Sequence, residues 1–129
     1  MATVELRGRR ILLTGASRGI GTHVALALAQ GGAKLVLTAR SAEALGAIAA
    51  RCEAAGAEGV TTIRADLLDA DDRGRVLAEA GELDVLINNA GVEYTKRLLA
   101  QSDAEVERQL ALNLHVPIEL SRRVLPGML

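Results

Sequence analysis

The segment from Thr14 to Gly21 has glycines at the spacing of a loop that could hold a phosphate group. It reads Thr-Gly-Ala-Ser-Arg-Gly-Ile-Gly and directly follows the apolar run 11–13. Backbone N–H groups at the start of a helix attract anions, and a loop that leads from a strand into a helix presents them to a phosphate. Gly15 permits the sharp turn off the strand, Gly19 lets the backbone approach the phosphates, and Gly21 lets the helix pack against the sheet. A tight strand-to-helix turn without a ligand is the alternative interpretation.

Apolar runs and helical periodicity predict the elements that position this loop. Four short runs predict strands buried on both faces, as in a parallel sheet; they lie at 11–14, 35–38, 59–65 and 83–88. Apolar residues at helical spacing predict helices over 20–30, 41–55 and 69–80 and a long helix from 102 to about 125. Gly31, Gly56 and Gly81 mark the ends of the first three helices, and Ser102 with Glu105 forms a capping box at the start of the long helix.

Strands and helices alternate along the whole sequence, which predicts an α/β fold. Short right-handed crossovers of this kind build a Rossmann-type, doubly wound parallel sheet with helices on both faces. The first strand is then central, and four strands take the spatial order 3-2-1-4. We expect residues 1–129 to form a single, partial domain of this type.

Composition and charge exclude several other classes of protein. Half of the 129 residues are apolar, but there is no Phe or Trp and only one Tyr, which favours aliphatic packing between a sheet and helices. The net charge is −1 and no basic block is present, which argues against nucleic acid as a partner. No apolar stretch reaches the roughly 18 residues that cross a membrane, and we expect a cytoplasmic protein. His23 and His115 have no partners at metal-ligand spacing, and we expect no metal site.

Several segments together resemble the short-chain dehydrogenase/reductase family. The spacing Gly-x3-Gly-x-Gly over 15–21 is similar to that family's loop and differs from the general dinucleotide-binding pattern. Asp66-Leu67 follows the third predicted strand, the run 88–91 (Asn-Asn-Ala-Gly) ends the fourth, and Asn113 lies in the long helix ahead of Leu125-Pro-Gly-Met. The likeness covers nearly the whole chain. It implies an oxidoreductase that transfers hydride between a nicotinamide cofactor and a carbonyl or alcohol substrate.

The resemblance also implies roles for individual residues. Asp66 is expected to hydrogen-bond the adenine amino group with Leu67 beside the ring, whereas a turn or helix-capping carboxylate is the alternative for Asp66. Asn89, Ala90 and Gly91 are expected to line the riboses, and Asn88 is expected to stabilise the sheet. The implied cofactor-binding residues are Gly15, Ser17, Arg18, Gly19, Ile20, Gly21, Arg40, Asp66, Leu67, Asn89, Ala90 and Gly91.

Arg40 and Arg18 indicate which dinucleotide is bound. Arg40 lies at the end of the second predicted strand, about 20 residues past the glycines, where an NAD enzyme usually has an acidic residue. A carboxylate there accepts bonds from the ribose hydroxyls and repels a 2′-phosphate, whereas a guanidinium matches phosphate oxygens. Arg18, in the glycine loop, can reach the same phosphate. We therefore expect NADP(H) as the cofactor in preference to NAD(H).

Asn113 and Pro117 together suggest one further feature of the long helix. Pro117 has no N–H, and the carbonyl of Asn113, four residues earlier, loses its helical partner. From the residues alone, a proline bend with Asn113 facing solvent is the simpler interpretation. The resemblance favours a catalytic role instead, because the matching Asn of the family holds a water of the proton relay through its main chain.

The family's remaining catalytic groups do not match residues of this sequence. The resemblance implies a Ser, a Tyr and a Lys four residues after the Tyr. Tyr94 is the only tyrosine and is followed four residues later by Leu98. The family pattern continues past its Leu-Pro-x-Met segment into a strand bearing the Ser, whereas this sequence ends at Leu129. We expect an NADP-binding domain truncated before the Ser, Tyr and Lys and inactive by itself.

Three hypotheses about function remain at this point. The first is the cofactor-binding part of an NADP-dependent reductase or dehydrogenase acting on a small carbonyl or alcohol. The second is a non-catalytic module that binds NADP, and the third is an inactive fragment. We also expect a homo-oligomer formed through the helix 102–126, because Val106, Leu110 and Ile118 would otherwise leave an apolar face uncovered, as would the edge strand 83–88.

Overall fold

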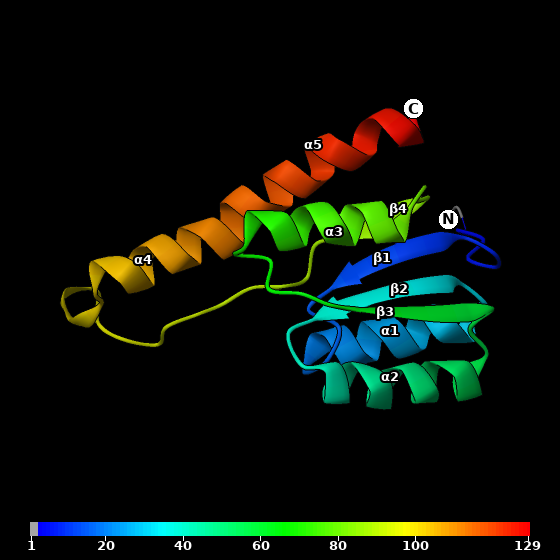
Figure 1. Ribbon diagram of the computed structural model, residues 1–129. Helices are drawn as coiled ribbons and strands as arrows, with labels where there is room; N and C mark the ends of the chain where they lie inside the picture. Colours follow the sequence, from blue (N-terminus) through cyan, green and yellow to red (C-terminus); the bar gives the residue numbers. More distant parts are fainter. Residues whose placement is uncertain (1–2) are drawn as a thin grey trace.

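The computed structural model describes residues 3–129 and contains a four-stranded parallel sheet (Figure 1). Its spatial order is β3-β2-β1-β4, which confirms the predicted topology with the first strand inside the sheet. The strands are β1 (Arg10–Thr14), β2 (Lys34–Ala39), β3 (Gly59–Arg64) and β4 (Val85–Ile87).

Helices cover both faces of the sheet, as predicted for a doubly wound fold. One face is covered by α1 (Ile20–Gln30) and α2 (Ala42–Ala55), and the other by α3 (Ala70–Ala80) and α5 (Val116–Met128) (Figure 1). Successive residues of a strand point to opposite faces of the sheet, and β1 therefore contributes side chains to the hydrophobic core on each face. Ile11 and Leu13 pack with α1 and α2, whereas Leu12 packs with α3 and α5, and all three are fully buried.

The helix ends follow from local side-chain chemistry. The Ser41 hydroxyl accepts a hydrogen bond from the Ala44 N–H at 3.1 Å, and Gly56 ends α2 in the left-handed conformation. The Asp69 carboxylate caps α3 in the same way, through the Asp72 N–H. Ser102 and Glu105 form both hydrogen bonds of a capping box at α4 (Asp103–Leu110). These predicted starts and ends are confirmed.

The long helix is continuous in space but changes its winding in the middle (Figure 1). Between α4 and α5 lies a π-helical turn, η2 (Ala111–His115), in which the Val116 N–H bonds to the carbonyl of Ala111, five residues back. Pro117 follows directly and has no N–H to continue an α-helical ladder. The predicted disturbance near Asn113 is therefore a single wide turn of helix.

The fourth strand is shorter than predicted. Its ladder with β1 covers only Val85–Ile87, whereas the sequence predicted a strand over 83–88. Beyond Ile87, the N–H groups of Asn89 and Ala90 both donate to the side chain of Thr14, at 3.0 and 2.9 Å. The chain therefore leaves the sheet at this point, and the apolar edge strand expected there is only three residues long.

Candidate functional site

A cleft of about 210 Å³ lies at the carboxyl ends of the four strands. Parallel α/β sheets bind ligands at this edge, where the strand order reverses on either side of the first strand. The cleft brings together residues that follow each strand and two residues of the long helix. Its lining includes Gly15, Ser17, Arg18, Arg40, Asp66, Leu67, Ala90 and Gly91 of the predicted set, and also Arg108 and Leu112, which the sequence motifs did not indicate.

The glycine loop closes the floor of the cleft by direct backbone contact. Gly15 has φ 64°, and a Cβ there would lie 2.8 Å from the Cα of Ala90. At Gly21 a Cβ would lie 2.0 Å from the carbonyl oxygen of Gly15. The predicted need for glycine is thus supported, because a Cβ at Gly21 would also lie 2.8 Å from the side chain of Asn89, just past the end of β4. Gly19 has φ 56° and open space where a side chain would stand, which leaves its backbone accessible.

Thr14 and Asn89 fix the loop against the end of β4. The Thr14 hydroxyl accepts the N–H groups of Asn89 and Ala90, and the Asn89 amide donates to the Gly15 carbonyl at 3.0 Å. Asn89 does not line the cleft itself but borders an adjoining hollow that shares Ala90, Gly91 and Val92 with the cleft. Sequence reasoning missed Thr14, although a buried hydroxyl at the end of the first strand was a usable signal.

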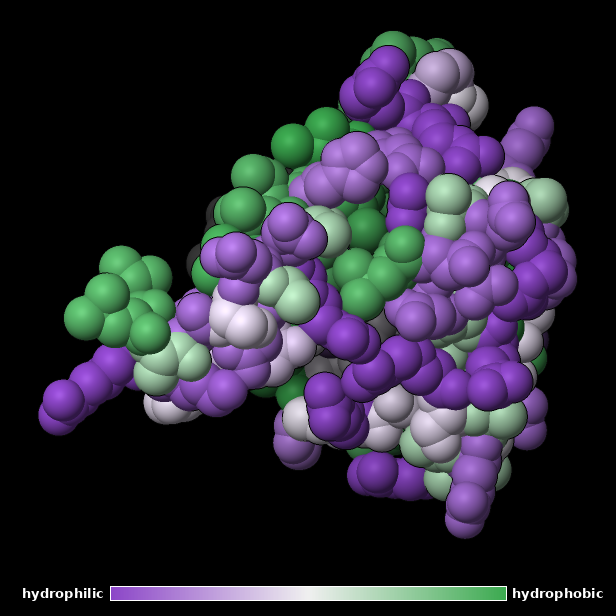
Figure 2. Space-filling view, turned by 60° about the vertical axis from the view of Figure 1, so that its left-hand side comes forward, coloured by the Kyte–Doolittle hydropathy of each residue, from purple (hydrophilic) through white to green (hydrophobic). Residues whose placement is uncertain are grey.

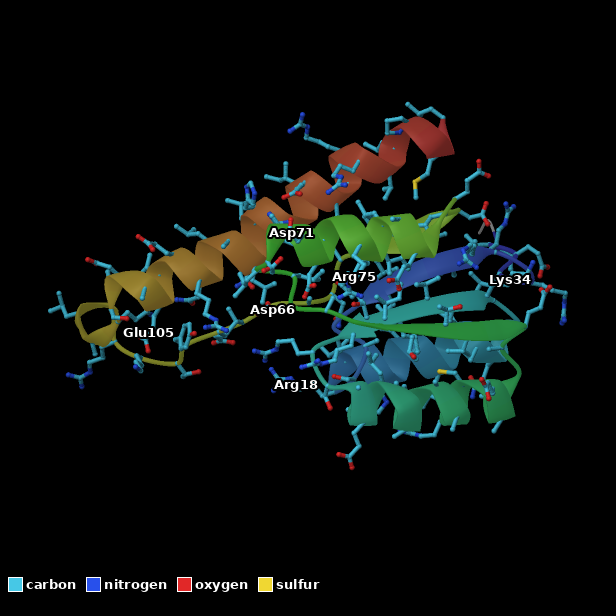
Figure 3. All side chains as sticks on the ribbon, viewed as in Figure 1. Arg18, Lys34, Asp66, Asp71, Arg75 and Glu105 are labelled. Carbon is cyan, nitrogen blue, oxygen red and sulfur yellow. The ribbon has the colours of Figure 1, made fainter. Side chains whose placement is uncertain are left out.

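Arg18 and Arg40 both line the cleft, from the glycine loop and from the end of β2. Figure 3 shows Arg18 at the carboxyl ends of the strands, on the same side of the molecule as Asp66. Both arginines are exposed, and neither guanidinium forms an ion pair within residues 3–129. Two positive charges without protein counterions favour an anionic ligand here.

Asp66 forms a turn and still has one carboxylate oxygen without a protein partner. Its Oδ1 accepts the N–H of Leu68 at 3.0 Å, and its own N–H donates to Asp72 at 2.8 Å. That backbone hydrogen bond, with a second from Arg75, lowers the pKa of Asp72 and keeps this carboxylate ionised. Oδ1 of Asp66 therefore forms a turn, as the alternative interpretation expected. Within residues 3–129 no hydrogen bond is made to Oδ2, which leaves this oxygen available to a ligand.

Asn113 lies outside the cleft and holds the loop after β4. Its side chain accepts the Val92 N–H at 2.8 Å and donates to the Val92 carbonyl at 2.7 Å. It borders a neighbouring open hollow together with Asn89, Gly91 and Pro117. Asn88, expected to stabilise the sheet, reaches across to the Ser121 hydroxyl of α5 at 3.3 Å. Gly19, Ile20 and Gly21 also do not line the cleft.

The chain matches known proteins along nearly its full length. The family model described as short chain dehydrogenase matches residues 9–129. This chain belongs to the short-chain dehydrogenase family. Ketoacyl reductase HetN of Nostoc is 37% identical over 128 residues, which are 96% of this chain and 44% of that relative.

Solved structures of short-chain dehydrogenases show the same arrangement of elements. A metagenomic short-chain oxidoreductase in complex with NADP is 39% identical, with a TM-score of 0.85 over 97% of this chain and 58% of that one. An NADH-dependent reductase complexed with NAD is 30% identical, with a TM-score of 0.83 over 95% of this chain and 53% of that one. The chain thus spans about half the length of the relatives that it matches.

None of the helices in residues 3–129 is long and apolar enough to cross a membrane. Within the same residues, no cluster of three or more His, Cys, Asp or Glu side chains is arranged to hold a metal ion.

Proposed function

We propose that this chain is the NADP(H)-binding domain of an oxidoreductase that transfers hydride between NADP(H) and a carbonyl or alcohol substrate. One observation carries the proposal: the glycine loop and two arginines without protein counterions border the same cleft at the carboxyl end of the sheet. The short-chain dehydrogenase family supplies the class of reaction.

The proposed binding mode assigns residues of the cleft, of the adjoining hollow and of the glycine loop to parts of the cofactor. The backbone of Gly15 to Gly21, with Ser17 and Ile20, holds the pyrophosphate at the start of α1. The free oxygen of Asp66 accepts the adenine amino group, and Leu67 lies against the ring. Ala90 and Gly91 border the riboses from the cleft and Asn89 does so from the adjoining hollow, while Arg18 and Arg40 receive the 2′-phosphate.

Arg40 is the basis for preferring NADP(H) to NAD(H). The solved relatives include one complexed with NADP and one complexed with NAD, and the fold therefore suits both cofactors. The choice lies in the side chain after β2, where a carboxylate suits ribose hydroxyls and a guanidinium suits a phosphate. The bound cofactor would supply or accept the hydride, and the protein residues orient it and manage the proton.

Turnover, by this proposal, requires the family's Ser, Tyr and Lys in addition to the residues described. The carbonyl oxygen gains negative charge during hydride transfer and needs a positioned acid, which contributes about a hundredfold to ten-thousandfold to the rate. Tyr94 has Leu98 four residues further on, which does not fit the Tyr and Lys pair of the family. The main chain of Asn113 is proposed to hold a water of the proton relay. That relay also needs the family's Tyr as the proton donor, and Tyr94 does not match it.

Calorimetric titration of the 129-residue chain with NADPH and with NADH tests the cofactor assignment. Charge-assisted hydrogen bonds contribute about 1.5 to 3 kcal/mol each before screening, and we expect NADPH to bind about ten- to a hundredfold more tightly. Arg40→Asp should abolish or reverse this preference, because a carboxylate repels the 2′-phosphate. Equal affinities for the wild-type chain, or an Arg40→Asp variant that still prefers NADPH, would contradict the assignment.

The same samples test where turnover resides. With NADPH and a panel of ketones, aldehydes and quinones, the 129-residue chain should show no steady loss of NADPH absorbance. A longer protein that continues through the family's Tyr and Lys segment is the positive control. Steady turnover by the short chain, removed by Tyr94→Phe, would show that its catalytic groups are already present.

A further inference from the structure

A second hollow of about 300 Å³ adjoins the cofactor cleft on the outer side of β3. It shares Arg40, Ala65 and Asp66 with the cleft, and the two therefore lie side by side. Its other lining residues are Arg64, Asp72 and Arg75. Three arginines and two aspartates leave this hollow with an excess of positive charge.

Arg75 and Asp72 form an ion pair, and their opposite charges add little to the excess positive charge of the hollow. Arg75 donates to the Asp72 carboxylate at 3.0 Å and to the carbonyl of Arg64 at 2.7 Å. Asp72 also accepts the N–H of Asp66. Figure 3 shows Arg75 extending from α3 toward the end of β3, near Asp66. This pair is therefore a structural tie between α3 and the end of β3.

Arg64 is held beside the backbone of Arg40, and its charge also contributes to the lowered pKa of Asp72. It lies opposite Ala39 in the ladder of β2 and β3, and its Nε donates to the carbonyl of Arg40 at 3.0 Å. Within residues 3–129, neither Arg64 nor Arg40 forms an ion pair, and the terminal nitrogens of Arg64 have no hydrogen-bond partner. The side chain of Arg64 is thus tied to the backbone of Arg40, and both arginines line the same hollow.

We propose that Arg64 is a third recognition residue for the 2′-phosphate of NADP(H), acting beside Arg40 from the shared hollow. The inference rests on the proposed function. A phosphate dianion bound by Arg18 and Arg40 alone would keep oxygen atoms facing solvent, whereas Arg64 offers two further donor nitrogens from the neighbouring strand. Arg64 belongs neither to the glycine loop nor to the segment at the end of β2. The pairing of β3 with β2 brings it next to Arg40.

Arg64→Gln, titrated with NADPH and NADH, tests the inference. Loss of one charge-assisted contact predicts that NADPH binds about tenfold more weakly while NADH affinity changes by less than about twofold. Arg64→Lys keeps the charge and should recover most of the lost NADPH affinity. Arg51→Gln removes an exposed arginine of α2 that lines neither hollow, and it should leave both affinities unchanged.

Three other results of these titrations would contradict either the role of Arg64 or the proposed function. Unchanged NADPH binding by Arg64→Gln, in a chain that binds NADPH, overturns the inference alone. Equal weakening for both cofactors also overturns it, because Arg64 then only holds the Arg40 segment in place. A wild-type chain that binds neither cofactor contradicts the proposed function itself.

Discussion

Gly21 is the residue at which the structure leaves least room for change. A Cβ would meet the Gly15 carbonyl at 2.0 Å and the Asn89 amide at 2.8 Å, and the first of these groups is backbone of the glycine loop itself. Gly21→Ala should therefore weaken NADPH binding by at least about tenfold and destabilise the fold by about 1 to 3 kcal/mol. Calorimetry and urea denaturation measure the two effects.

Gly46 provides the matched control for that substitution. It also lies in a helix, α2, but nothing lies within 4 Å of an added Cβ. Gly46→Ala should leave NADPH binding unchanged and stabilise the chain by about 0.5 to 1 kcal/mol, because alanine is the better helix former. A Gly21→Ala variant that binds NADPH like the wild type would show that α1 can shift away from the loop.

Arg73 connects α3 to the segment after β3 and to α5. It is only 8% exposed, and its Nη1 donates to the carbonyl of Leu67 at 2.8 Å. Its Nε lies 2.8 Å from Glu119 of α5, as an ion pair without the alignment of a hydrogen bond. The same carboxylate lies 3.4 Å from the half-exposed Arg123. Glu119 therefore has one buried and one solvent-exposed arginine partner.

This difference in burial predicts that substitution of Arg73 and of Arg123 lowers the free energy of unfolding by very different amounts. Arg73→Gln removes a buried charge and leaves Glu119 short of its main partner, and it should lower the free energy of unfolding by about 3 kcal/mol. Arg123→Gln removes an exposed partner and should cost less than about 0.5 kcal/mol. Denaturation of both variants in urea measures the contrast, and similar costs for the two would contradict the role assigned to Arg73.

Elements with local signals were predictable from the sequence, and those set by distant contacts were not. Ser41, Asp69 and the Ser102–Glu105 box mark helix starts because a cap needs only its own next residues. The short length of β4 depends on the Thr14 hydroxyl, which comes from another strand. The π-helical turn before Pro117 and the role of Arg64 likewise depend on the assembled fold.

One apolar face of the long helix is exposed at the surface of the molecule. Leu110, Leu114 and Ile118 are 57%, 56% and 51% exposed, and Figure 2 shows apolar surface gathered on this side of the molecule. Burial of such a face is favourable, and we expect the chain to form dimers or larger assemblies at tens of micromolar, on the order of usual assay concentrations.

Light scattering measures that association directly. A double variant, Leu114→Glu with Ile118→Glu, places like charges on the face and should shift the chain toward monomer without touching the cofactor cleft. Gly46→Ala serves again as a control with an intact face. A wild-type chain that stays monomeric in this concentration range would contradict the predicted assembly through the long helix.

Binding of NADP(H) in the cleft at the carboxyl ends of the strands, on which the other proposals depend, is tested most directly by NMR. Amide shifts of the isotope-labelled chain are followed during titration with NADPH. We expect the largest changes at residues 15–21, 40–41, 66–68 and 90–92, with little change on the outer face of α2, and weaker changes around residue 40 with NADH. Shifts that map elsewhere, or no shifts at saturating NADPH, would contradict the assignment of the cleft.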